Sequence, residues 1–224
     1  MVAQALHRLS PERKVPQILD ALETCYGRPR RPRRDPLTVL VRGVLSQNTS
    51  DTNSGRAYET LMERFGSWEA ISRAAEAGIG QAIESGGLAA QKAATIRRIL
   101  VSLRERGGYS LDYLQALPPE QAERELTAIK GVGVKTARLV LLFGFGVPVF
   151  VVDTHVLRVS RRLGIIPPNC TRHKAHVLLD AIVPDRRKYS AHMNMIRHGR
   201  ETCHARRPAC DPCPIRRWCC FVRA

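Results

Sequence analysis

The strongest constraint on the fold is a helical pattern that recurs along nearly the whole chain of 224 residues. Segment 89–106 shows it most clearly, because apolar side chains recur there at helical spacing while arginines occupy the opposite face. Its apolar positions are Ala94, Ile96, Ile99, Leu100 and Leu103. Only segment 147–153 has the character of a strand, and a single strand has nothing to pair with, so we expect a buried extended connection there. The sequence therefore predicts an all-α fold.

Several helix starts are marked by capping residues. Ser10 and Asp35 each precede a proline, which is favoured at the first helical position, and Ser67 opens another amphipathic run. Two segments interrupt the helical pattern. Residues 27–36 (GRPRRPRRDP) place five arginines between prolines and are predicted to form a linker or a strap that touches phosphate. Residues 144–148 (GFGVP) break the chain after a very apolar helix.

The net charge of +16 concerns the partner of the protein more than its fold. A large positive field attracts polyanions and makes association fast and salt-sensitive, so nucleic acid is the leading candidate, ahead of a surface that is basic only for solubility. No segment combines a basic face with the aromatic-rich apolar face that favours membrane attachment. The N-terminus lacks an apolar core of signal-peptide length, and the longest apolar run, residues 139–152, is too short to span a bilayer. We therefore expect a cytoplasmic protein.

Residues 126–146 (LTAIKGVGVKTARLVLLFGFG) have the pattern of a helix-hairpin-helix motif. One helix is predicted to end near Lys130, Gly131 and Gly133 to form a tight turn, and an apolar helix to begin at Val134. Two glycines let the backbone approach a phosphate, the unpaired N–H groups of the second helix attract the anion, and Lys130 adds charge. Such a turn can also be only a turn, but together with the net charge the pattern favours binding of the DNA backbone.

Two residues near this hairpin are candidates for chemistry. Lys135 lies one residue inside the second helix, where a positive dipole end and other cations disfavour its ammonium, so we expect its pKa to be lowered. Asp153 lies eighteen residues further on and is predicted to be the N-cap of the next helix. An exposed helical lysine and a simple cap are the ordinary alternatives. The hypothesis is that the amine and the carboxylate converge on one cleft.

Five of the seven cysteines lie between Cys203 and Cys220. The first four, Cys203, Cys210, Cys213 and Cys219, follow the spacing C-x6-C-x2-C-x5-C and leave Cys220 over. In a reducing compartment, clustered cysteines bind metal more often than they form disulfides. Zinc sites usually pair two short C-x2-4-C knuckles and this run has only one, whereas four thiolates wrapped this closely are compatible with an iron–sulfur cube.

Five motifs in a fixed order resemble the endonuclease III family of DNA-repair glycosylases. The motifs are LSQNTSD (45–51), SGGLAAQKA (85–93), IKGVGVKTA (129–137), VDTHVLRV (152–159) and HGRETC (198–203), which runs into the terminal cysteines. The resemblance as a whole covers the chain from about residue 36 to residue 220.

The resemblance implies two helical lobes that flank a DNA-binding cleft. Residues 36–146 would form a six-helix domain that includes the hairpin. Residues 1–35 would pack with the second lobe, whose remainder is 147–202, and residues 203–220 would form a metal-cluster loop. The implied partner is double-stranded DNA that contains damaged pyrimidines or abasic sites, bound by a monomer. The hairpin residues Lys130, Gly131, Gly133 and Val134 would contact its backbone.

The resemblance also implies a mechanism in which a damaged pyrimidine is flipped out of the duplex. Lys135 would attack the sugar C1′, displace the base and form a Schiff base, while Asp153 would stabilise the cationic sugar and assist proton transfer. β-Elimination would then cut the strand on the 3′ side of the abasic site.

Further DNA contacts are implied for Gln47, Asn48 and Leu88. Asn48 matches the residue that fills the hole left by the flipped base; it is shorter than the usual glutamine, which leaves lesion preference and opposite-base dependence open. Leu88 matches a second wedge residue, with a leucine of the loop core as the alternative.

Lys135 and the absence of an acidic residue in VLVRGVLSQ (39–47) favour oxidised pyrimidines as substrates over an adenine-specific or mismatch-specific relative. A non-catalytic DNA-binding relative is the remaining alternative, and the presence of both Lys135 and Asp153 argues against it.

The family pattern at the terminal cysteines is a 4Fe-4S cluster, so the resemblance makes the four spaced cysteines its ligands and Cys220 a bystander. Four arginines in the same loop are then expected to be held as a preformed phosphate-binding surface: Arg206, Arg207, Arg216 and Arg217.

Overall fold

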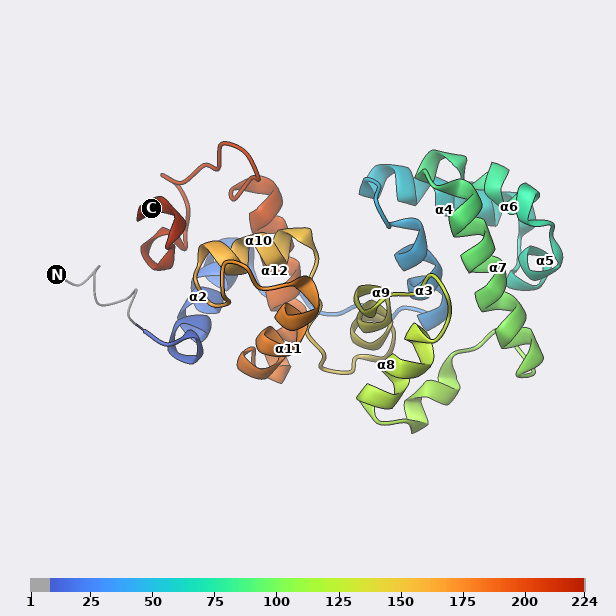
Figure 1. Ribbon diagram of the computed structural model, residues 1–224, viewed down its shortest axis with the longest axis horizontal. Helices are drawn as coiled ribbons and strands as arrows, with labels where there is room; N and C mark the ends of the chain where they lie inside the picture. Colours follow the sequence, from blue (N-terminus) through green and yellow to red (C-terminus); the bar gives the residue numbers. More distant parts are fainter. Residues whose placement is uncertain (1–8, 224) are drawn as a thin grey trace. The chain divides into compact units, whose positions relative to one another are not determined.

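The computed structural model describes residues 9–223, and within that range the chain is helical and has no strand. The first eight residues of the predicted segment 1–35 lie outside the described part. The chain divides into two compact units (Figure 1). One unit consists of the two ends of the chain, up to Arg31 and from Pro148 onward, and the other consists of Pro32–Val147. No helix within residues 9–223 is long and apolar enough to cross a membrane.

The terminal unit is built from four longer helices. They are α2 (Pro11–Tyr26), α10 (Thr154–Arg162), α11 (Arg172–Ile182) and α12 (Lys188–Glu201), with short 3₁₀ turns at Asp185–Arg187, Arg216–Trp218 and Phe221–Arg223. Helix α2 contacts α11 and α12, so the N-terminal helix completes a core formed mainly by the C-terminal part of the chain. Trp218, from the cysteine-rich loop, is fully buried in that core.

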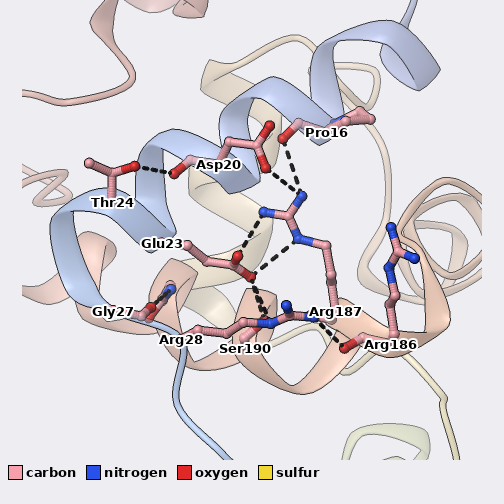
Figure 2. A network of polar contacts seen from close by, with 10 residues as sticks. Pro16, Asp20, Glu23, Thr24, Gly27, Arg28, Arg186, Arg187 and Ser190 are labelled. Atoms are coloured by element: carbon pink, nitrogen blue, oxygen red, sulfur yellow. Dashed lines mark hydrogen bonds and ion pairs between the residues drawn. The ribbon is translucent and has the colours of Figure 1, made fainter.

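Arg187 joins the two sequence-distant parts of this unit (Figure 2). Its guanidinium lies 2.7 Å from the carboxylate of Asp20 and 3.1 Å from that of Glu23, both on α2. The carboxylate of Glu23 also accepts a hydrogen bond of 2.8 Å from the Ser190 hydroxyl on α12. The Glu23 side chain is largely buried, so this contact holds α2 against α12 with less screening than a surface pair.

The central unit begins at the helix that Asp35 caps. Its helices are α3 (Pro36–Leu45), α4 (Asp51–Phe65), α5 (Trp68–Arg73), α6 (Glu76–Ala82), α7 (Ala89–Glu105), α8 (Pro119–Thr127) and α9 (Val134–Leu139), with 3₁₀ turns at Glu84–Gly86 and Asp112–Ala116. The carboxylate of Asp35 accepts a hydrogen bond from the Thr38 amide at 2.7 Å, and Ser67 caps α5 by accepting one from the Ala70 amide at 3.1 Å. Ser10 is the N-cap residue of α2, with Pro11 following it. The predicted helix starts are therefore confirmed.

The apolar helix after the hairpin changes its winding. Helix α9 continues into a π-helical segment at Val140–Phe145, and the chain leaves the helix at Gly146, whose φ is +77°. A Cβ atom on Gly144 would lie 3.0 Å from the Cα of Pro36, so a glycine is needed where this segment packs on the start of α3. The break after the apolar helix was predicted, but the π-helical winding was not.

The extended connection expected at residues 147–153 is confirmed. Residues 146–153 have no helix, and the side chains of Val149, Phe150, Val151 and Val152 are buried. Residues 27–35, the arginine- and proline-rich segment, are likewise without helix.

Candidate nucleic-acid interface and metal centre

The predicted hairpin joins α8 to α9 in the central unit, and its two glycines serve different purposes. Gly131 has φ +101°, and a Cβ atom there would lie 2.3 Å from Oγ1 of the buried Thr95, so the turn requires glycine for conformation and for packing. Gly133 has an ordinary φ of −96°, and a Cβ atom there would meet nothing within 4 Å. It is the N-cap residue of α9, so the open space lies at the first N–H groups of that helix. That space can admit an anion.

The outer carbonyls of the turn are held by side chains from other helices and loops. The side-chain amide of Gln47 donates a hydrogen bond to the carbonyl of Gly131 at 3.1 Å, and Arg98 donates to the carbonyl of Lys130. Lys130 itself is exposed. The amide nitrogen of Gln47 therefore supports the hairpin in this structure, and its predicted contact with DNA stays a prediction.

Lys135 follows directly on Val134, the first residue of α9, and is partly buried. Its neighbour Thr136 is buried against α3, where a Cβ atom on Gly43 would lie 2.9 Å from the Thr136 side chain. This close approach of α3 and α9 fixes the first turn of α9 and thereby the backbone from which Lys135 projects. The lowered pKa of Lys135 stays a prediction.

A polar hollow of about 300 Å³ lies beside α3 and α9 within the central unit. Hydroxyl groups, guanidinium groups, one carboxylate and apolar side chains line it. The polar members are Arg34, Thr38, Arg42, Ser46, Asp51 and Ser54, and the apolar members include Val39, Leu139 and Phe143. Such a lining can accept a planar polar group and hydrogen-bond its edges.

Asp153 is the N-cap residue of α10, as predicted. Its Oδ1 accepts a hydrogen bond from the Val156 amide at 2.7 Å, a cap that is worth about 1 kcal/mol. Lys135 and Asp153 belong to different units, and their convergence on one cleft stays a prediction.

The extended segment before Asp153 is held by side chains of α11 and α12. Asp180 accepts a hydrogen bond from the Phe150 amide at 2.5 Å, and the ammonium of Lys188 donates to the carbonyl of Pro148 at 2.8 Å. The Nδ1 atoms of the buried His176 and His192 lie 3.1 Å and 3.0 Å from the carbonyls of Phe150 and Val151. Because a carbonyl oxygen only accepts, both imidazoles carry a proton on Nδ1.

Two candidate DNA contacts in the central unit have left-handed backbone conformations. The φ angles are +52° at Asn48 and +50° at Leu88, and 52% of Leu88 is exposed. The alternative that Leu88 belongs to the loop core is therefore wrong. Asparagine tolerates this conformation, whereas a leucine held there is both strained and exposed, which is a combination typical of functional loops.

The four predicted cluster ligands line one largely apolar hollow in the terminal unit, together with His198. All seven cysteines are free thiols, so the loop contains no disulfide. The pKa of Cys213 is raised to about 11, chiefly by burial and to a smaller extent by the proximity of the other three cysteines of the set, Cys203, Cys219 and Cys210. Cys220 is exposed and lies outside this lining.

The chemistry of this donor set fits a polynuclear cluster. Within residues 9–223, no three cysteine, histidine or acidic side chains are close enough to hold a single metal ion. Four cysteine sulfur atoms that line one hollow are the donor type that iron–sulfur clusters take, and the iron would also compensate the thiolate charges. Arg162 adds a hydrogen bond of 3.1 Å from its guanidinium to the Cys203 sulfur.

The role of α10 in holding this loop was not predicted from the sequence. Arg162 also donates to the carbonyl of His204 at 2.7 Å, and Arg158 donates to the carbonyl of Cys203 at 3.0 Å and to that of Gly199 at 2.8 Å. The spacing of Arg158 and Arg162 places both on one face of the helix that Asp153 caps. That spacing was visible, but the partners lie 41 to 45 residues away in the sequence.

The four arginines of the loop differ in their surroundings. Arg216 lies 2.6 Å from the Asp211 carboxylate, and the guanidinium of Arg217 lies 3.9 Å from the centroid of the Trp218 ring. Within the described chain, the exposed side chains of Arg206 and Arg207 make no hydrogen bond or ion pair. Arg206 and Arg207 are therefore the better placed to meet a phosphate.

Comparison with known proteins shows the family to which the chain belongs. Residues 41–185 match the HhH-GPD superfamily of base excision DNA repair proteins, and the chain belongs to that superfamily. It is 35% identical over 189 residues to endonuclease III of Rickettsia felis, with 83% of each protein covered. It belongs to the endonuclease III family, whose members are DNA glycosylases and AP lyases of base excision repair.

Two further similarities are close. The chain is 38% identical over 177 residues to a putative DNA glycosylase of Arabidopsis thaliana, and the match spans 79% of this chain and 60% of the plant protein. A solved structure of a non-covalent endonuclease III–DNA complex superposes with a TM-score of 0.82 at 28% identity, covering 95% of this chain and 96% of that one. The predicted all-α helix-hairpin-helix fold is thereby confirmed.

Proposed function

We propose that this protein is a bifunctional DNA glycosylase and AP lyase that removes oxidised pyrimidines from double-stranded DNA. The observation that carries the proposal is the combination of an open helix N-terminus at Gly133 with a lysine two residues later. The first offers a seat for a backbone phosphate, and the second offers an amine next to it. Membership of the endonuclease III family supports both assignments.

In this proposal the chain's own residues perform each step. The phosphate backbone binds at the hairpin through the amides that follow Gly133, with Lys130 and the arginines of the cysteine loop adding charge. Asn48 and Leu88 enter the duplex and take the place of the extruded nucleotide, and the base occupies the polar hollow beside α3.

The covalent step belongs to Lys135. Its unprotonated amine attacks C1′ of the sugar, and the base leaves with the electrons of the glycosidic bond and takes up a proton. The C1′–O4′ bond then opens to give the Schiff base, and β-elimination cuts the strand on the 3′ side. Asp153 stabilises the positive charge that develops on the sugar, as carboxylates do at other glycosidic bonds. The oxidised-pyrimidine specificity rests on the presence of this lysine.

We propose further that Cys203, Cys210, Cys213 and Cys219 hold a 4Fe-4S cluster and that the protein acts on DNA as a cytoplasmic monomer. When bound, the cluster would cross-link the loop and supply a structural anchor. Arg162 would donate to the Cys203 sulfur, and Arg158 would fix the carbonyl of the same residue. Iron in place of zinc by elemental analysis, together with visible absorption, supports this assignment; zinc would contradict it.

Borohydride trapping tests the proposed function. A duplex with thymine glycol or an abasic site should yield a covalent adduct with the wild-type protein and none with Lys135→Ala. Lys130→Ala is the matched control, because it removes a lysine from the same hairpin and should weaken binding while the adduct still forms. An undiminished adduct from Lys135→Ala, or no adduct from the wild type, would exclude Lys135 as the nucleophile.

A further inference from the structure

Lys92 is a lysine in an unusual place. It lies on α7 with only 2% of its surface exposed, and no carboxylate within the described chain forms an ion pair with it. Lysines are rarely buried without an acidic partner. The Lys92 ammonium instead donates two hydrogen bonds to backbone carbonyls, one of 2.7 Å to Leu45 and one of 2.8 Å to Gly86.

Both carbonyls belong to the last residue of a helical segment. Leu45 ends α3, and Gly86 ends the 3₁₀ turn Glu84–Gly86. The last carbonyls of a helix have no partner within it and carry the negative end of the helix dipole. One ammonium therefore satisfies the last carbonyls of two helical segments, which would otherwise be buried without hydrogen-bond partners. Burial lowers the pKa of Lys92, so the amine is held there against a cost of desolvation.

The two segments that follow these carbonyls carry Asn48 and Leu88, the two non-glycine residues of the central unit that have a positive φ. The chain passes from Leu45 to Asn48 in three residues and from Gly86 to Leu88 in two. The second segment is also packed tightly, because a Cβ atom on Gly86 would lie 3.2 Å from the Cβ of Ala57 on α4. Lys92 itself lies in the first turn of α7, which begins directly after Leu88. A single side chain thus connects both loops to one helix.

We propose that Lys92 is the positioning residue that fixes the separation of the Asn48 loop and the Leu88 loop, so that both side chains enter the duplex together. The inference rests on the proposed function, because it assumes that these two residues occupy the hole left by an extruded base. Lys92 does not touch the reacting atoms. Its contribution is the fixed spacing of the two loops, which would otherwise order only at the moment of binding and at an entropic cost.

The test compares two substrates that differ in their need for the wedge residues. One is a duplex with thymine glycol opposite adenine, which requires extrusion of a stacked nucleotide. The other is a single-stranded oligonucleotide with an abasic site, which requires none. Lys92→Met should lower the single-turnover rate on the duplex at least tenfold and leave cleavage of the single strand within twofold of wild type. Lys174→Met, which removes an exposed lysine from α11, should change neither rate by more than twofold.

Several outcomes would overturn the proposal. An unchanged duplex rate in a folded Lys92→Met variant would mean that the ammonium does not set the loops, and an equal loss on both substrates would place its effect on the chemistry. If Lys92→Met does not fold, Lys92→Arg and Lys92→Gln decide the question. Arginine can donate to both carbonyls and should retain most of the duplex rate, whereas glutamine is too short to reach both. Equal rates for these two variants would refute the positioning role.

A second measurement is independent of activity. In the wild type, the backbone amide of Gln47 donates to the carbonyl of Val44, and the backbone amide of Gly87 donates to the carbonyl of Glu84. Hydrogen exchange at both amides should be at least tenfold faster in Lys92→Met, because both loops lose the same tie. Faster exchange in one loop alone would contradict the coupling. If the wild type acts on neither substrate, the proposed function is rejected. The hydrogen-exchange result then still tests whether Lys92 holds the two loops together.

Discussion

Replacing Gly131 by alanine should destabilise the central unit, because the new side chain would strain the backbone of the hairpin and collide with Thr95. The residue has φ +101°, a conformation that costs a side-chain-bearing residue about 1–2 kcal/mol. The new Cβ atom would also lie 2.3 Å from Oγ1 and 2.8 Å from Cγ2 of Thr95. Thr95 cannot turn away freely, since it is buried and its hydroxyl donates to the carbonyl of Gln91 at 3.0 Å.

The magnitude follows from adding these contributions. Overpacking of this kind costs about 1–3 kcal/mol, so with the backbone contribution Gly131→Ala should lower the free energy of unfolding by about 2–5 kcal/mol. For a chain of this size, a loss of about 3 kcal/mol corresponds to a melting temperature lower by about 6–12 °C. Removing the obstacle should restore part of the loss, so Thr95→Ala in the Gly131→Ala background should raise the melting temperature again.

Gly133→Ala is the matched control, two residues away in the same turn. Its φ of −96° suits alanine and its Cβ would meet nothing, so the free energy of unfolding should stay equal or rise by up to about 1 kcal/mol. Its methyl group would, however, stand where a phosphate is proposed to bind. Affinity for a labelled duplex, measured by fluorescence polarisation, should fall about tenfold.

The two assays thus separate packing from binding. A Gly131→Ala variant that melts like the wild type would refute the close packing against Thr95. A Gly133→Ala variant that binds DNA undiminished would refute the proposed phosphate seat at the start of α9.

Three further predictions follow from other parts of the molecule. Arg206→Gln combined with Arg207→Gln should reduce the slope of log DNA affinity against log salt concentration by about 2. The same changes at Arg216 and Arg217 should reduce the slope less, because these guanidinium groups are already paired or stacked. Equal reductions by the two double variants would contradict this difference in surroundings. Arg187→Met should lower the free energy of unfolding by about 2–3 kcal/mol, because the largely buried Glu23 loses its close ion pair and keeps only the guanidinium of Arg28, 3.8 Å away. The control Arg197→Met breaks an exposed pair with Glu201 and should cost at most about 0.5 kcal/mol by urea denaturation, and equal costs would show that burial is not the cause. Finally, burial lowers the pKa of Lys92 in the folded chain below the ordinary value of 10.5 that it has in the unfolded chain. At a pH between the folded and the unfolded pKa, the unfolded chain therefore holds a proton that the folded chain has released. The free energy of unfolding of the wild type relative to Lys92→Met should therefore rise with pH across that window, and a flat or falling difference in urea titrations would be inconsistent with a buried ammonium.

The features that sequence could predict are those whose cause is local. The caps at Asp35, Ser67 and Asp153 are visible because a capping side chain bonds an amide three residues later. The turn at Gly131 and Gly133 is visible because glycine between two apolar runs marks a change of direction. The break after the apolar helix was predictable from the glycines and proline of residues 144–148, and the buried extended connection from the strand-like pattern of residues 147–153.

The features that sequence could not predict depend on distant partners. Lys92 reads as an exposed helical lysine until its two carbonyl partners, 47 and 6 residues away, are known. The π-helical winding at Val140–Phe145 has the same apolar composition as an α-helix, and the tight packing of Gly144 on Pro36 is a tertiary contact. Likewise, the arginines of α10 gave no sign that they hold the carbonyls of the cysteine loop.

The central claim is that the amine of Lys135 forms the covalent bond to the sugar. The most direct measurement is to trap the protein with borohydride on an abasic duplex, digest the adduct, and locate the modified residue by mass spectrometry. We expect a sugar-bearing peptide that contains Lys135. Modification of another lysine or of the N-terminal amine would contradict it.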